Sequence, residues 1–326
     1  MAREERVVEY FVVAIKKDDD AQAELAYAYP EDTEDCREFC ENVTMFMFPH
    51  AFGVDWNKRG LPPPPIHNLF ALTDVNGDHL YGASLCFYET LQSPDAVGDE
   101  DNNNNNSSCT SSEAGTVQHQ HQAKSICLLS RRPFYTQLLR TLEQLFLLGI
   151  QQCRVNHDIS KLDQGFTCWH GVENTLCNLF HEVPVPFRGL AVQLSVADVE
   201  VALERPVMQE FPFDMDAELM IYAFMMVDPK VMAQLYHHVL LEHRILIVGT
   251  DSVLVTAIAE AIKCLVFPMT WLHVFIPNVP DSLDLSTLLE APVPFIAGAH
   301  IGQLKHVQIP DNVVKLEFTD GKFPMN

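Results

Sequence analysis

The stretch LLEHRILIVGTDSVLVTAIAEAIKCLVFPMTWLHVFIPNVPDSLDLSTLLEAPVPFIAGA, residues 240–299, decides the fold class. Its run ILIV at 245–248 is continuously aliphatic, which is typical of a strand buried on both faces. An apolar stripe at helical spacing follows, formed by Leu254, Ile258, Ile262 and Leu265. Pro268 ends this helix because a proline ring cannot continue a helix interior. The next strand is WLHVFIP at 271–277, and this strand, helix and strand predict a right-handed β-α-β crossover with parallel strands.

A second helix is predicted immediately upstream. Asp228 and Pro229 suit its N-cap and first position, because aspartate accepts free amide bonds there and proline has no amide to leave unpaired. An apolar stripe follows, formed by Val231, Leu235, Val239 and Leu240. The C-terminal half is therefore predicted to be α/β.

The N-terminal half predicts an antiparallel sheet of about five strands with helices against it, an α+β arrangement. Asn76 and Gly77 separate two strand-like runs, and Asn-Gly is a strong hairpin signal because both positions tolerate positive φ. Residues 133–150 carry apolar residues at helical spacing and predict an amphipathic helix. Strands are expected at residues 7–15, 25–29, 45–49 and 125–130, with an acidic loop before the third and a polyproline spacer at 60–65.

Residues 91–124 interrupt this half with a polar stretch of low complexity. The stretch contains a run of five asparagines and several serines. Such a composition buries too little apolar surface to fold, so we expect a disordered surface loop. Further along, the pattern predicts a loop at 154–165, a helix within 166–183, short strands within 190–206, and a hairpin or edge strand after residue 300.

Several separated features of this pattern resemble the central module of the DENN family of Rab regulators. They are Glu242 and Arg244 before the aliphatic strand, Phe267, Pro268, Trp271, His273 and Pro277 around the next strand, and Ala291, Pro292, Pro294, Phe295 and Gly298. The first half is similar to the longin-like upstream module of that family, in the order FVV, FP, ALTD, YGASLCFYE and CLLSRRPFY.

The resemblance implies a longin-like module at residues 1–150 and a central DENN α/β module at 151–326. Two domains also suit 326 residues, since one core rarely serves so long a chain. DENN proteins usually continue into a third, helical module, and the residues after His300 are too few to supply it. A fragment, a natural short form and loss of that module all remain open.

Composition excludes several function classes. The net charge of −23 argues against nucleic acid, because phosphate binding needs clustered lysine and arginine. Nine cysteines without a signal peptide predict reduced thiols and a cytoplasmic protein. No apolar run approaches the roughly eighteen residues of a transmembrane helix.

Motifs for covalent chemistry and cofactors are weak. The turn VGTDS at 248–252 lacks the further glycines of a dinucleotide fingerprint and the Gly-Lys pair of a phosphate loop. The histidines at 237, 238 and 243 match no HExxH pattern, and no G-x-S-x-G elbow is present. We therefore expect no catalytic residue, cofactor or metal.

The resemblance implies a guanine-nucleotide exchange factor that promotes GDP release from a Rab GTPase held between the two modules. The implied partner-binding residues are Ser130, Arg131, Glu242, Arg244, Trp271, His273 and Pro277. Each of these residues also has a purely structural interpretation. Trp271, His273 and Pro277 suit a core or strand end, Glu242 and Arg244 could form an ion pair, and Ser130 with the following arginines could cap the helix at Pro133.

A non-catalytic DENN-like scaffold that binds a GTPase or trafficking partner is the alternative. An α/β enzyme that uses the VGTDS turn is a third hypothesis, which a nucleotide or metal bound to the native protein would support. Under the first two readings the protein is expected in membrane trafficking, recruited through its partner to endosomal, Golgi or other vesicle membranes.

Overall fold

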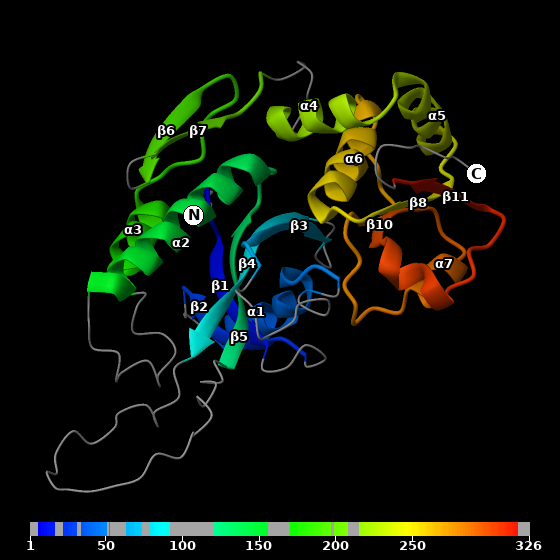
Figure 1. Cartoon of the computed structure of the whole chain (residues 1–326). Coiled ribbons are helices and arrows are strands. Elements are labelled where there is room, and N and C mark those ends of the chain that lie inside the picture. Colours follow the sequence, from blue (N-terminus) through cyan, green and yellow to red (C-terminus); the bar gives the residue numbers. More distant parts are fainter. Residues whose placement is uncertain are drawn as a thin grey trace, which may run out of the picture.

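The structure is a computed structural model that describes residues 6–16, 22–30, 34–50, 52, 63–73, 78–91, 120–155, 170–196, 199–207 and 215–318. These residues form a five-stranded antiparallel sheet, a four-stranded parallel sheet and a two-stranded sheet, with helices packed around them (Figure 1). The mixed α/β and α+β fold class is thereby confirmed.

The N-terminal lobe is built on the antiparallel sheet, whose strand order is β2-β1-β5-β4-β3. Its elements are β1 (Tyr10–Lys16), β2 (Glu24–Tyr29), α1 (Glu34–Met47), β3 (Ile66–Thr73), β4 (His79–Leu91), β5 (Gln120–Ser130) and α2 (Tyr135–Val155). The strands expected at 7–15, 25–29 and 125–130 are confirmed, as are the antiparallel β3–β4 pair and the amphipathic α2. Asn76, Gly77 and residues 60–62 of the polyproline stretch lie outside the described residues.

Helices cover both faces of this sheet. In β1, Phe11 and Val13 face the apolar cluster that contains α2, whereas Val12 and Ala14 face the cluster that contains α1. This alternation follows from the period of two in a strand, because successive side chains point to opposite faces. The strand reads as uniformly apolar because neither face meets water.

Two expectations for this lobe are wrong. Residues 45–49 do not form a strand, because Met45 to Met47 are the last turn of α1, and the part of the expected acidic loop from Glu34 onward belongs to the same helix. Cys36, Cys40, Val43 and Met47 recur at helical spacing and lie on or in the cluster beneath the sheet. The predicted insertion at 91–124 is also too long, since Leu91 ends β4 and residues 120–124 belong to β5. Residues 92–119 lie outside the described part.

The middle of the chain packs against α2. Its elements are α3 (His170–His181) and the antiparallel pair β6 (Ala191–Val196) and β7 (Val199–Glu204). Helix α3 and both strands contact α2, so they lie beside the N-terminal lobe (Figure 1). The helix and short strands expected here are confirmed, whereas the loop at 154–165 lies mostly outside the described residues. The division of the chain at residue 150 stays a prediction.

The C-terminal lobe is built on the parallel sheet, whose strand order is β11-β8-β10-β9. Its elements are α4 (Ala217–Met226), α5 (Pro229–Leu240), β8 (Arg244–Gly249), α6 (Ser252–Leu265), β9 (Val274–Ile276), α7 (Leu285–Glu290), β10 (Phe295–His300), the 3₁₀ helix η4 (Ile301–His306) and β11 (Val313–Glu317). As predicted, β8 precedes α6 in the chain, β9 follows it, and the two strands are parallel. In the sheet, however, β10 lies between them. The last strand, β11, is an edge strand.

Both faces of β8 are buried, as its aliphatic run predicts. Ile245 and Ile247 face the cluster that contains α6, and Leu246 and Val248 face the cluster that contains α7. The predicted helix start is also confirmed, because the Asp228 carboxylate accepts a 2.8 Å hydrogen bond from the backbone N–H of Lys230. Within the described part of the chain no helix is long and apolar enough to cross a membrane.

The two lobes meet where α6 covers the edge strand β3. An edge strand presents backbone groups without a neighbouring strand. Here the Leu69 carbonyl accepts hydrogen bonds from the Thr256 hydroxyl at 3.0 Å and the Asn278 amide at 3.3 Å. The His67 carbonyl accepts one from the Ser252 hydroxyl at 3.4 Å. Side chains of the C-terminal lobe thus take the place of a sixth strand.

A buried ion pair lies at the same joint. The Tyr135 hydroxyl of α2 donates a 2.9 Å hydrogen bond to Glu260 of α6, and Glu260 pairs with Lys263 at 2.6 Å. The Lys263 ammonium also lies 4.1 Å from the ring centre of Phe275. Burial acts to lower the pKa of Lys263, but Glu260 and Tyr81 together outweigh it and the net pKa is raised, which favours the ammonium form.

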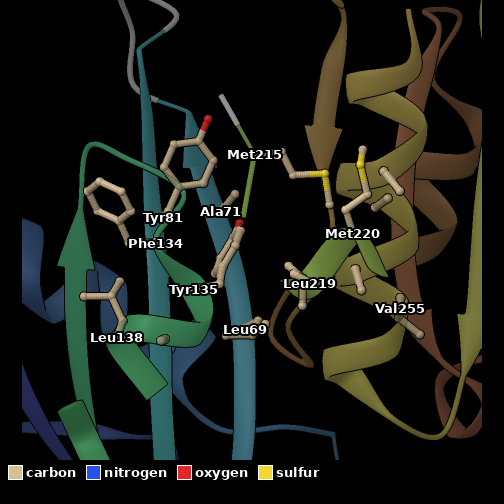
Figure 2. Close-up of a cluster of buried hydrophobic side chains, with 14 of the residues drawn as sticks. Leu69, Ala71, Tyr81, Phe134, Tyr135, Leu138, Met215, Leu219, Met220 and Val255 are labelled. Atoms are coloured by element: carbon tan, nitrogen blue, oxygen red, sulfur yellow. The ribbon is translucent and has the colours of Figure 1, made fainter. Parts of the chain in front are cut away.

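The apolar core is continuous across this joint. One cluster of buried side chains runs from the first sheet and α2 through α4 to α6 and β8. Figure 2 shows Tyr135 and Leu69 of the N-terminal lobe opposite Leu219 of α4 and Val255 of α6. The two lobes therefore share one apolar cluster at their joint.

Asp216 links the helices of the two lobes. One carboxylate oxygen caps α4 by accepting from the backbone N–H groups of Glu218 and Leu219, at 2.9 and 3.1 Å. The other accepts from the N–H of Thr136 in the first turn of α2, at 2.7 Å. Burial raises the pKa of this carboxyl, while the hydrogen bonds from Thr136, Leu219 and Glu218 act to lower it. A single side chain thus accepts hydrogen bonds from the N-terminal turns of two helices.

We expect Asp216→Ala to lower the free energy of unfolding by roughly 2–4 kcal/mol, because it removes the caps of two helices. Asp228→Ala removes the cap of α5 alone and should cost about 1 kcal/mol. Urea denaturation followed by circular dichroism measures both. Equal losses in the two variants would show that the bond to Thr136 contributes nothing.

Candidate functional site

A groove of about 590 Å³ opens between the two lobes, with α1 and β3 on one side and β9 on the other. We call it the interlobe groove. Its apolar lining consists of Phe39, Val43, Phe46, Ala71, Leu72, Leu272, Val274, Phe275, Ile276 and Leu283, and its polar lining of Asn42, Thr73 and His273. The joint between α6 and β3 holds its walls in place, because Phe275 in the lining is backed by the Lys263 ammonium.

An exposed apolar segment borders the groove between α6 and β9. Leu272 lines the groove and is 86% exposed, and Met269 in the same segment is 59% exposed. Single exposed apolar residues are common on protein surfaces. Two of them beside a concave apolar surface instead indicate an interaction site.

Three of the predicted site residues converge at this border. The His273 Nε2 atom lies 3.2 Å from a carboxylate oxygen of Glu242, and the Trp271 and His273 rings contact edge to face at 5.1 Å. Trp271 is buried, and its indole N–H donates to the Val274 carbonyl at 3.2 Å. Trp271 therefore fixes the segment, while His273 and Glu242 present polar atoms to solvent.

Arg244 has a structural role instead of the expected pair with Glu242. Its guanidinium donates to the backbone carbonyls of Leu289 and Ala291, at 3.2 and 3.1 Å. These carbonyls lie at the C-terminal end of α7, where helical carbonyls lack intrahelical partners. The predicted Glu242–Arg244 ion pair is wrong, because Glu242 faces His273 and Arg244 faces α7.

Pro277 lies at the opposite end of β9 and is buried. Its carbonyl packs so closely on Gly298 of β10 that a Cβ atom on residue 298 would overlap it. Pro277 and Gly298 are both among the residues on which the family resemblance is based. The close approach of the two backbones explains why these residue types stand there. Pro277 is not among the residues that line the groove.

Ser130 and Arg131 lie at the end of β5 and do not line the groove. The buried Ser130 hydroxyl accepts from the backbone N–H of Arg132 at 3.1 Å, and Arg131 pairs with Glu9 at 3.3 Å. The expectation that these residues cap α2 is wrong, because Asp216 accepts the hydrogen bond from the first turn of that helix.

The histidines near the end of α5 contact one another. The Nδ1 atoms of His238 and His243 lie 2.9 Å apart, and burial together with His243 lowers the pKa of His238. Among the described residues, no group of three histidine, cysteine or acidic side chains is arranged to hold a metal ion.

Sequence reasoning missed the residues of α1 and the exposed Leu272. Phe39, Val43 and Phe46 form one wall of the groove, but they fall in the region expected to be a loop and a strand. Their spacing of four and three residues is the helical signal that would have identified this wall.

Comparison with known proteins gives two matching family models and a set of relatives. Residues 121–320 match the model described as DENN (AEX-3) domain, and residues 23–87 match the one described as uDENN domain. DENN domain-containing protein 1A of Homo sapiens is 31% identical over 135 residues, which are 41% of this chain and 13% of that protein. The Xenopus laevis protein of that name is 27% identical over 290 residues, which are 89% of this chain and 23% of its own length. The matched part is thus less than a quarter of either relative.

We expect Arg244→Met to lower the free energy of unfolding by about 1–3 kcal/mol, because two charge-assisted hydrogen bonds to α7 are lost. Arg37→Met is the matched control, since the ion pair that the structure shows for Arg37 is an exposed one with Glu41, and its loss should cost about 0.5 kcal/mol or less. Urea unfolding measures both variants. An unchanged free energy of unfolding in Arg244→Met would contradict the structural role of Arg244.

Proposed function

Because the chain belongs to the DENN (AEX-3) domain family, we propose that it is a guanine-nucleotide exchange factor for a Rab GTPase and binds the GTPase at the interlobe groove. The observation that carries this proposal is the groove itself, a concave apolar surface bordered by the 86% exposed Leu272 and the pair His273–Glu242. An apolar surface with a few convergent polar groups suits a protein partner.

Exchange on such a surface needs no covalent chemistry. The switch segments of a GTPase are ordered by contacts to the nucleotide phosphates and magnesium. A partner that binds these segments in another arrangement favours the nucleotide-free form, so GDP leaves and GTP replaces it by mass action. The exchange factor thus acts by binding one state more tightly than the other.

The predicted site residues divide into two roles in this proposal. Leu272, His273 and Glu242 contact the GTPase, whereas Trp271, Arg244 and Pro277 hold the segment and strands that present them. Arg131, 40% exposed at the end of β5, is proposed as a contact on the N-terminal lobe. Ser130 shapes the turn beside Arg131.

Charge favours a basic partner. The chain carries a net charge of −23, and an acidic surface accelerates encounter with a partner that presents lysine and arginine. We propose that the protein acts in the cytoplasm and reaches endosomal, Golgi or other vesicle membranes through a membrane-attached Rab. Binding to a Rab without exchange would instead identify a scaffold.

The decisive measurement is release of fluorescent GDP from each member of a Rab panel, with the chain at micromolar concentration. We expect one Rab or a few related ones to respond. For a responding Rab, Leu272→Ser should lower kcat/KM for exchange by about 10–100-fold, because burying a leucine contributes about 1.5–3 kcal/mol. The free energy of unfolding should stay within about 0.5 kcal/mol of the wild type.

Met225→Ser is the matched control, because Met225 on α4 is 78% exposed but lies outside the lining of the groove. We expect it to exchange nucleotide as the wild type does. No response from any Rab would refute the proposal. A responding Rab for which Leu272→Ser matches the wild type would move the binding site away from the groove.

A further inference from the structure

The end of α5 has an unusual residue at a position that normally takes glycine. The backbone N–H of His243 donates to the His238 carbonyl at 3.1 Å, and the N–H of Glu242 donates to the Val239 carbonyl at 3.0 Å. These two bonds form a Schellman motif, in which the residue after the C-cap adopts the left-handed conformation. That residue is Glu242, with φ of +53°.

Glutamate is a costly choice for this turn. Its Cβ crowds the backbone at positive φ, whereas glycine adopts this conformation without a steric penalty. Among the non-glycine residues that the structure describes, Glu242 alone has a positive φ. The turn would therefore be more stable with glycine.

The Glu242 carboxylate adds little to the stability of the folded chain. The contact of Glu242 that the structure shows is the pair with His273, and their side chains are 65% and 31% exposed. Exposed pairs contribute little to stability, because water and salt screen them. A strained residue whose side chain does not stabilise the fold indicates a functional constraint at that residue.

The location of Glu242 indicates what that constraint is. Glu242 contacts His273, and His273 lines the interlobe groove together with the exposed Leu272. A carboxylate at the border of a groove that an exposed leucine lines suits a partner surface that has both a lysine or arginine and an apolar residue.

We propose that Glu242 is a partner-binding residue at the border of the interlobe groove, which binds a lysine or arginine of the GTPase and lowers the stability of the free chain. This assignment rests on the function proposed above. It gives Glu242 a role in partner binding, whereas Arg244, two residues away, stabilises the fold.

The test compares Glu242→Gly and Glu242→Gln with the wild type, for a Rab that the wild-type chain binds. Both variants should weaken binding of the nucleotide-free Rab about tenfold or more at low salt. The difference should shrink as salt rises to about 0.5 M, because the Debye length falls to a few ångströms. Glu242→Gly should melt at the wild-type temperature or about 2 °C above it, because the strain is removed.

The variants separate the charge from the backbone. Glu242→Gln keeps the strained backbone and the side-chain shape, so its loss of binding reports the charge alone. Glu290→Gln is the matched control, since Glu290 is an exposed glutamate at the end of α7 and its replacement changes the net charge equally. It should bind as the wild type does.

Each outcome decides the assignment. Wild-type affinity in both Glu242 variants, or a melting temperature of Glu242→Gly several degrees below the wild type, overturns it while the proposed exchange activity stands. A wild-type chain that binds no Rab overturns the proposed function and this assignment together. Weaker binding by both variants, with Glu242→Gly at least as stable as the wild type, supports it.

Discussion

The fold depends on how the free edge of β3 is covered. The backbone carbonyls at this edge have no neighbouring strand to bond to, and the chain covers them with a helix instead of another strand. Thr256, Ser252 and Asn278 supply the hydrogen bonds that a neighbouring strand would have made. Because these bonds join particular carbonyls to particular side chains, they fix the position of α6 along the strand. This joint lies next to the interlobe groove, which β3 lines on one side and β9 on the other.

The ion pair behind the groove adds specificity to this joint. Replacing a buried pair with apolar residues is often neutral, whereas removing one partner is strongly destabilising. Glu260 pairs with Lys263 within α6 and accepts a hydrogen bond from Tyr135 of α2. We infer that the hydrogen bond from Tyr135 to this buried pair selects one packing of the two lobes among the many that a purely apolar contact would permit. Asp216 has a similar effect, since the termini of α2 and α4 must both approach one carboxylate.

The sequence predicted the parts of the fold that local patterns determine. The aliphatic run of β8, the cap at Asp228 and the antiparallel pair around Asn76 were each identified from a few neighbouring residues. The errors arose where distant parts decide the outcome. Insertion of β10 between β8 and β9 depends on the whole sheet, and α1 was obscured because its acidic start resembles a loop.

The candidate site shows the same division. Glu242, Trp271 and His273 were named from the family resemblance, and the structure brings them together at one end of the groove. Arg244 and Pro277 were named with them but pack on α7 and β10. The opposing wall, formed by α1, could not be paired with β9 from the sequence, because more than two hundred residues separate them. The apolar cluster that the two lobes share has a mechanical consequence. Because close-packed interiors deform little, we expect the two lobes to keep their arrangement in the proposed reaction, so that the GTPase is the partner that changes shape when GDP leaves.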